Sequence, residues 1–192
     1  VDQAEQEREL AFTVNAEAPG VMADACFELD IPLIHYSTDY VFDGTSPRPY
    51  RETDATNPLN VYGRTKRDGD LALQQTCPQH LIFRTSWVVG AHGNNFAKTM
   101  LSLAKERDSL SIVADQMGAP TSAALLADVT AQLIGRMQRE GHSNFPFGLY
   151  NCTNGGVTSW HAYACFVLQQ ALDADIALKI HPNKVKPITT AE

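Results

Sequence analysis

Short β-rich apolar runs alternate with longer amphipathic segments along most of this chain, and this alternation limits the folds that it can adopt. Strands are indicated at residues 31–37, 80–90, 110–115 and 147–153, and helices at residues 58–75, 94–107, 123–140 and 159–172. Helices between strands act as crossover connections, which make neighbouring strands parallel. We therefore expect an α/β fold with a doubly wound, mainly parallel sheet that is covered by helices on both faces.

Both ends of the sequence lack an element that such a fold would need. Residues 1–30 have a helical pattern, but no strand precedes them for the helix to pack on. Residues 181–192 contain no recognisable closing element. We therefore expect the sequence to be truncated at both ends. The apolar residues expected on one buried face of the first helix are Leu10, Val14, Val21, Ala25 and Leu29.

Charge and cysteine content argue against several classes of function. The net charge is −7 and the 15 Lys and Arg are scattered, which does not favour nucleic acid or an anionic membrane as a partner. No apolar run is long enough to predict a transmembrane helix. The histidines and the four cysteines show no metal-ligand spacing, so we expect no metal and free thiols in a reducing cytoplasm.

A polar loop follows the first predicted strand, and Asp43 and Gly44 within it are predicted to form a turn. In an open parallel sheet, ligands bind beyond the carboxyl ends of the strands. Ser86 and Trp87 follow the next predicted strand in the same way. We therefore expect the two stretches to line one crevice. The other polar residues of the first stretch are Ser37, Thr38, Asp39 and Tyr40.

Tyr62 and Lys66 are four residues apart in the next predicted helix, for which Asn57 is a candidate N-cap and Pro58 a candidate first residue. This spacing places both side chains on one helix face. A nearby ammonium lowers the pKa of a phenol, and such a pair can give a proton to a carbonyl oxygen during reduction. The spacing alone is weak, because an exposed helix face with a solvated lysine shows it as well.

Seven segments occur in a recognisable order along the chain: VDQAEQE, VNAEAPG, HYSTDYVFDG, NPLNVYGRTK, RTSWVVG, GNNFAKTM and DQMGAPTSA. Together they resemble a known family, the dTDP-4-dehydrorhamnose reductases of the extended short-chain dehydrogenase/reductase superfamily. The resemblance implies a Rossmann-like fold whose first βαβ part is absent. Residues 1–115 would be the dinucleotide-binding part. Residues 116–192 would be a mixed segment that contributes to a small substrate domain and supplies one last Rossmann strand and helix.

The resemblance also implies an enzyme of dTDP-rhamnose biosynthesis for cell-surface polysaccharides. It would act in the cytoplasm on a dTDP-sugar, reducing the C4 carbonyl of dTDP-4-dehydro-L-rhamnose with NADPH or NADH. A homodimer is compatible with this reading. The family's glycine-rich phosphate loop is not in the sequence, so we expect this polypeptide alone to bind NADPH poorly and to be weakly active or inactive.

Site residues follow from the same resemblance. Tyr62 would donate the proton, Lys66 would hold the nicotinamide ribose and tune Tyr62, and Thr38 would hydrogen-bond the substrate oxygen. Structural roles remain open for four further site residues. Asn15 could instead brace a loop, Trp87 could belong to the core, and Asn95 and Gln116 could be ordinary loop residues. The implied cofactor contacts are Tyr62, Lys66, Asn15, Ser37 and Ser86, and the implied substrate contacts are Thr38, Asp39, Tyr40, Trp87, Asn95 and Gln116.

Two other functions remain open. A reductase-like regulatory subunit, of the kind found in methionine adenosyltransferase, would bind a partner protein without turning over a sugar. Another sugar-nucleotide epimerase or dehydratase of the superfamily would share Tyr62 and Lys66 with a reductase. Dehydratases usually carry an acidic pair after the threonine of the strand-end loop, and here Tyr40 follows Asp39, which disfavours them.

Overall fold

The chain forms two compact units, each built from two separate stretches of sequence. The computed structural model describes all residues from Val1 to Glu192. The first unit comprises Val1–Thr85 and Asp128–Cys152, and the second comprises Ser86–Ala127 and Thr153–Glu192. The sequence predicts a functional division of the chain between residues 115 and 116. The compact units do not test that division, which stays a prediction. No helix combines the length and the apolar character needed to cross a membrane.

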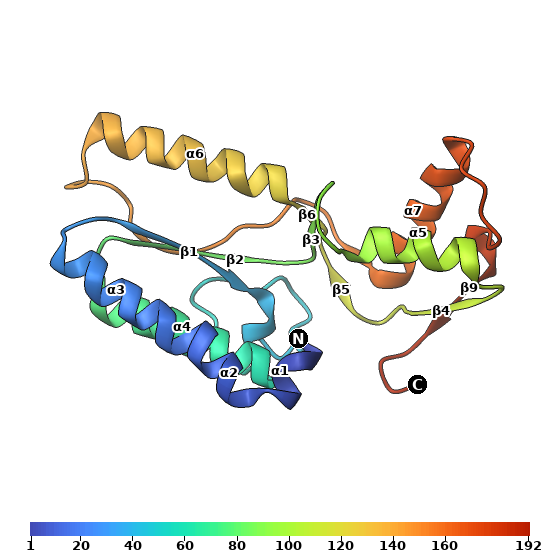
Figure 1. Ribbon diagram of the computed structural model, residues 1–192, viewed down its shortest axis with the longest axis horizontal. Coiled ribbons are helices and arrows are strands. Elements are labelled where there is room, and N and C mark those ends of the chain that lie inside the picture. The colour runs from blue at the N-terminus through green and yellow to red at the C-terminus, as the bar shows by residue number, and fades with distance from the viewer. The chain divides into compact units, whose positions relative to one another are not determined.

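A parallel sheet of three strands forms the centre of the first unit, with the order β1-β2-β7. Helices α3 and α4 cover one face of β1 and β2, and α6 covers the other (Figure 1). This arrangement confirms the predicted α/β fold with helices on both faces of a parallel sheet. The bounds are β1 Leu33–Thr38, β2 His80–Thr85, β7 Gly148–Asn151, α3 Ala18–Glu28, α4 Val61–Thr76 and α6 Ala123–Glu140.

Alternation along β2 explains why both faces of the sheet are apolar. Ile82 packs with Ala23 of α3 and Leu73 of α4. Its neighbours Leu81 and Phe83 point to the opposite face and pack against the α6 side of the sheet. Each such side chain, when fully buried, stabilises the fold by about 1.5–3 kcal/mol. The sheet is therefore anchored to a helical layer on each side.

The first thirty residues are helical as predicted, but the predicted buried face is wrong. Leu10, Val14, Val21, Ala25 and Leu29 are all exposed. The small residues Ala11, Ala16 and Ala23 are buried instead, because the helices approach α4 too closely for larger side chains between the backbones. The elements here are α1 Asp2–Gln6, α2 Arg8–Phe12, a π-helix Thr13–Glu17 and then α3.

The second unit has its own core, in which α5 and α7 pack beside the parallel pair β4 and β9. Its buried centre includes Ala104, Leu168 and Val185. The strand β9 lies within residues 181–192, so the expectation of no closing element there is wrong. A proline at position 187 fits β9 because each strand of a two-stranded sheet is an edge. The bounds are α5 Phe96–Glu106, β4 Leu110–Val113, α7 Trp160–Asp173, a 3-10 turn Pro182–Lys184 and β9 Val185–Ile188.

The strand predicted at residues 80–90 is interrupted after Thr85. Trp87 has a φ of 46°, a left-handed conformation that ends one strand before the next begins. The pair β3 and β6 is parallel, and the pair β5 and β8 is antiparallel. The bounds of these short strands are β3 Val88–Val89, β5 Met117–Gly118, β6 Thr121–Ser122 and β8 Thr158–Ser159.

Candidate active site

Thr38 is the last residue of β1 and starts the 3-10 turn Asp39–Val41. Its hydroxyl oxygen accepts a hydrogen bond from the Tyr40 backbone N–H at 3.2 Å. The same hydroxyl donates to Asp39 Oδ1 at 3.2 Å. The strand end thus fixes a hydroxyl at the carboxyl edge of the sheet, where ligands of such folds bind.

Tyr62 lies in the first turn of α4. The helix begins at Val61, and its N-cap is Asn60, whose Oδ1 accepts from the Gly63 N–H at 2.7 Å. The predicted start at Pro58 with Asn57 as the cap is therefore wrong, and Asn57 instead donates to Asp43. A turn residue such as asparagine fits either position, so the propensity did not distinguish them.

Gly63 lets the polar loop pack directly on α4. A Cβ at this position would lie 2.2 Å from the Tyr40 carbonyl oxygen, which no other residue could accommodate without a shift. The close approach brings the rings of Tyr40 and Tyr62 together edge to face, with their centroids 5.7 Å apart. The loop and the helix are thus held in register around the Tyr62 phenol.

The surroundings of Tyr62 determine its protonation state. Partial burial raises the pKa of the phenol, and a hydrogen bond with Thr38 lowers it. The negative charges of Asp39 and Asp70 raise it further. The net shift is upward and Lys66 is not among its causes, so the expected lowering of the Tyr62 pKa by the ammonium is wrong. The phenol is protonated near neutral pH and can act as a proton donor.

Lys66 is buried one turn after Tyr62, on the same helix face. Its ammonium donates to the Tyr36 carbonyl at 2.7 Å and to His35 Nε2 at 3.0 Å. Only 9% of its surface is exposed, which contradicts the alternative of a solvated lysine on an exposed face. Burial lowers the pKa of Lys66, and the charge of Asp70 opposes that effect.

Asn15 and Ser37 flank this pair from different elements. Asn15 lies in the π-helix and donates to Thr65 Oγ1 at 3.1 Å, so it braces α4 beside Lys66. Single π-helical turns are frequent at functional sites. The Ser37 hydroxyl is buried without a hydrogen-bond partner, although it lies near enough to Asp70 to lower the pKa of that carboxyl.

The remaining predicted residues belong to the second unit. Ser86 donates to the Ala119 carbonyl at 2.8 Å. Asn95 is the N-cap of α5 and accepts from the Lys98 N–H at 3.1 Å. Gln116 donates to Thr190 at 3.2 Å. Each of these side chains has a partner in its own unit, and their ligand roles stay predictions.

Trp87 has the most constrained position of these residues. Its ring stacks on Trp160 with the centroids 3.5 Å apart and the planes at 14°. Gly118 makes room for it, because a Cβ there would lie 2.6 Å from the indole ring. The Trp87 ring is therefore held by Trp160 and by its close approach to Gly118, at a residue with a positive φ.

Three charged or titratable residues near Lys66 were not predicted as site residues. Asp70 accepts from Arg84 Nε at 3.1 Å, and His35 Nε2 lies 3.9 Å from the other oxygen of Asp70. Arg84 also lies over the ring of Phe42. A signal was present, because Asp70 continues the spacing of four residues that joins Tyr62 and Lys66 on α4.

Asp43 organises the loop between β1 and α4, as the predicted turn required. It accepts hydrogen bonds from the Thr45 N–H, the Thr45 hydroxyl, the Tyr50 hydroxyl and the Asn57 amide. Gly44 beside it has a φ of 74°, which favours glycine. The four donors hold the pKa of Asp43 well below its usual range.

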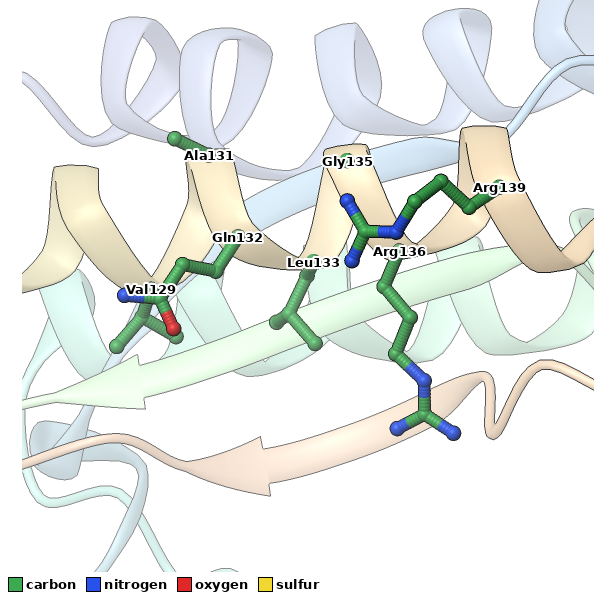
Figure 2. A pocket seen from close by; sticks show the side chains of 7 residues that line it. All are labelled: Val129, Ala131, Gln132, Leu133, Gly135, Arg136 and Arg139. Atoms are coloured by element: carbon green, nitrogen blue, oxygen red, sulfur yellow. The ribbon is translucent and has the colours of Figure 1, made fainter.

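A separate hollow of about 470 Å³ lies along α6. Gln132, Leu133 and Arg136 extend from the helix on the side of the strands (Figure 2). Arg136 is already paired with Glu140 at 2.7 Å and lies over the Phe145 ring. The hollow contains none of the predicted site residues, so the chemistry described above lies elsewhere.

Comparison with known proteins places the chain in a family. The model described as RmlD substrate binding domain matches residues 1–192. The dTDP-4-dehydrorhamnose reductase of Salmonella typhimurium is 54% identical over 180 residues, which cover 94% of this chain and 59% of that protein. The reductase of the same name from Escherichia coli is 50% identical, over 98% of this chain and 62% of that protein.

A solved structure gives the same result. The dTDP-4-dehydrorhamnose reductase of Bacillus anthracis, in complex with NADP, superposes with a TM-score of 0.86 at 37% identity, over 100% of this chain and 62% of that one. The chain therefore spans about three fifths of the length of these relatives. Because the family model matches from the first residue to the last, this chain belongs to the RmlD substrate binding domain family.

Proposed function

We propose that the protein containing this chain reduces the C4 carbonyl of dTDP-4-dehydro-L-rhamnose to dTDP-L-rhamnose with NADPH or NADH. The reaction would serve dTDP-rhamnose biosynthesis for cell-surface polysaccharides. The observation that carries the proposal is the hydrogen bond between Thr38 and Tyr62 at the carboxyl end of β1, with Lys66 buried one turn further along α4. The names of the relatives and the NADP complex of the Bacillus anthracis protein support it.

Tyr62 is the proposed acid. Its pKa is raised, so the phenol holds its proton until the carbonyl oxygen of the substrate gains negative charge. The phenol then gives that proton to the oxygen, and the hydrogen bond with Thr38 stabilises the phenolate that remains. A positioned acid of this kind contributes about 10²–10⁴-fold to a rate.

The donor set around Lys66 fits a nicotinamide cofactor. An ammonium has three N–H groups, and two of them are used on Tyr36 and His35. The third is left for a ribose hydroxyl, and the unpartnered Ser37 hydroxyl lies on the same side of β1 as His35. When bound, the nicotinamide supplies the hydride. Asn15 and Ser86 complete the proposed cofactor contacts.

The residues proposed to contact the sugar come from both polar stretches. The stacked indole of Trp87 gives a rigid apolar wall of the kind that suits a deoxysugar ring. Burial raises the pKa of Asp39 to about 6, so this carboxyl can exchange its bond with Thr38 for one with a sugar hydroxyl. Tyr40, Asn95 and Gln116 are the remaining proposed substrate contacts.

A cytoplasmic location and a homodimer belong to the same proposal. All four cysteines are free thiols, which suits a reducing compartment. Large apolar side chains on the first helices, including Phe12, Val21 and Phe27, are exposed and suit a protein interface. Analytical ultracentrifugation of the full-length protein tests the dimer.

The proposed reaction is tested with the full-length protein and its 4-keto sugar. We expect the nicotinamide absorbance to fall with one NADPH consumed per product, and NMR to identify a new C4 hydroxyl group. dTDP-glucose, which has no C4 carbonyl, is the control and should give no oxidation. A product with an inverted centre or a lost water would assign an epimerase or dehydratase. Absence of any turnover would favour the regulatory subunit.

A further inference from the structure

The ammonium of Lys66 is buried without a carboxylate at its side. Its acceptors are the Tyr36 carbonyl and His35 Nε2, and no carboxylate oxygen lies within 4.0 Å of Nζ. Since Nε2 of His35 accepts, the ring proton is on Nδ1 and the imidazole is neutral, in keeping with a pKa lowered to about 4 by burial and by Lys66. A buried ammonium held only by neutral groups tends to lose its proton.

Asp70 is the carboxylate that faces this pair. It lies one turn after Lys66 on α4 and is completely buried. Its Oδ1 is 3.9 Å from His35 Nε2 and has no hydrogen-bond partner. Its Oδ2 accepts from Arg84 Nε at 3.1 Å, and Arg84 is itself 6% exposed. Asp70 thus contacts Arg84 with one oxygen and approaches with the other the same His35 nitrogen that accepts from Lys66.

The titratable and charged groups around these four side chains come from several elements. Helix α4 supplies Tyr62 and Asp70, β1 supplies His35, and β2 supplies Arg84. Asp39, in the turn after β1, acts on Tyr62, and Glu52 acts on Arg84 from the loop before α4.

Burial raises the pKa of Asp70, whereas Ser37, Arg84 and Lys66 each lower it. Burial lowers the pKa of Lys66, and the charge of Asp70 opposes that effect.

We propose that Asp70 is the buried counter-ion of Lys66 and is held as an ion by Arg84. Asp70 is then a positioning residue that keeps the Lys66 ammonium charged without a direct salt bridge. The link is through His35, whose Nε2 lies 3.0 Å from the ammonium and 3.9 Å from Asp70 Oδ1. Since Asp70 makes no contact with the ammonium, the third N–H group of Lys66 stays available for a ligand.

The test separates the carboxylate of Asp70 from its structural pairing with Arg84. Asp70→Asn alone would leave a buried guanidinium unpaired, which is strongly destabilising. Arg84→Gln keeps the carboxylate and removes the guanidinium. The double variant Asp70→Asn/Arg84→Gln replaces the ion pair with two amides that can hydrogen-bond each other. Asp70→Leu/Arg84→Met is the second version, because apolar side chains often replace a buried ion pair without loss of stability.

The first readout needs no reaction. The full-length protein is labelled with carbon-13 at the lysine ε-carbon, and the Lys66 signal is assigned from Lys66→Met. We expect the titration midpoint of Lys66 to be lower in the double variants than in Arg84→Gln, by about one pH unit or more. Asp68→Asn removes a partly exposed charge from the same helix and should leave the midpoint unchanged. Equal midpoints in Arg84→Gln and both double variants would overturn the proposal.

The second readout links the charge of Lys66 to catalysis. This readout rests on the proposed function, whereas the first does not. The alkaline limb of kcat/KM for the keto sugar should move to lower pH in the double variants, by the same amount as the Lys66 midpoint. If the Lys66 midpoint shifts but the protein never oxidises NADPH, the pairing of Asp70 with Lys66 is supported and the proposed function is rejected. If the protein is active but the alkaline limb of kcat/KM does not move in the double variants, the positioning role of Asp70 is rejected.

Discussion

Asp39 and Asp43 lie four residues apart in one loop and have opposite electrostatic surroundings. Burial raises the pKa of Asp39 to about 6, against the lowering effect of its bond with Thr38. Asp43 is held ionised by four hydrogen-bond donors. The loop thus combines a structural carboxylate, which fixes its shape, with a site carboxyl that titrates close to neutral pH.

Replacing Asp39 by asparagine should stabilise the protein only where the carboxyl is ionised. The folded-state pKa of about 6 is above the unfolded value of 3.8. The protonated form is therefore favoured by folding, and stability falls as the pH rises through this window. We expect Asp39→Asn to raise the free energy of unfolding by about 1–3 kcal/mol at neutral pH and by little near pH ~4. Urea unfolding at both pH values measures this.

Asp43→Asn is the matched control for that experiment. An asparagine has one carbonyl oxygen in place of two carboxylate oxygens, so it loses acceptor capacity that the loop uses. It should destabilise the protein at neutral pH, opposite in sign to Asp39→Asn. If Asp39→Asn gave the same change at both pH values, the account of its ionisation would be wrong.

Gly118 is expected to control the orientation of Trp87. A Cβ at position 118 would lie 2.6 Å from the indole, so Gly118→Ala should push the ring off Trp160. Near-ultraviolet circular dichroism should lose the signal of the coupled indoles, and KM for the sugar should rise more than kcat falls. Gly155→Ala, which meets no atom within 4 Å, is the control. An unchanged spectrum in Gly118→Ala would contradict the packing described.

At the residue scale, the sequence predicted those site residues whose positions depend on a single helix or strand. Tyr62 and Lys66 are linked by helical spacing, and Thr38 is placed by the end of its strand. The contacts of Asp70 with His35 and Arg84 depend on the register of two strands beneath a helix. Ser37 lies opposite Arg84 in that register, and nothing local in the sequence fixes it.

At the scale of elements, α4 depends on two close approaches to its backbone. Gly63 accommodates the Tyr40 carbonyl, and Gly69 accommodates the Asn15 carbonyl of the π-helix. In both places an added Cβ would lie 2.2 Å from a backbone oxygen. Glycine lowers helix propensity, so its presence twice in one helix reflects packing rather than local preference.

Gly69→Ala should therefore destabilise the protein in spite of its better helix propensity. The π-helix that carries Asn15 would have to shift, and overpacking of this kind costs about 1–3 kcal/mol. Gly20→Ala is the matched control in α3, where the new Cβ would make an ordinary 3.6 Å contact with Ala72. It should add about 0.5–1 kcal/mol. Urea unfolding of both variants gives the comparison, and a stabilised Gly69→Ala would refute the close approach.

Element predictions succeeded where a segment had strong periodicity. The predicted helix at residues 123–140 coincides with α6, and the one predicted at residues 159–172 matches α7 to within one residue at each end. The first helices failed because large exposed side chains carried the helical period while alanines made the contacts. The strand β9 was missed because its partner β4 is distant in sequence and Pro187 disfavours a strand.

At the scale of the whole molecule, the two compact units are interleaved along the chain. Each unit takes residues from both halves of the sequence, so neither could be delimited by composition or by a linker. The family resemblance was more informative, because it extends over residues 1–192. The chain covers only 59% of the Salmonella typhimurium reductase, so tests of activity belong to the full-length protein.

The central claim is that the Tyr62 phenol delivers the proton to the reduced carbonyl. The most direct measurement is the rate of NADPH oxidation by full-length Tyr62→Phe with saturating keto sugar. Tyr150→Phe, which removes an exposed phenol bound to the Pro146 carbonyl, is the control and should retain normal turnover. We predict that Tyr62→Phe lowers kcat by about 10²–10⁴-fold. A Tyr62→Phe protein as fast as the control would contradict the account.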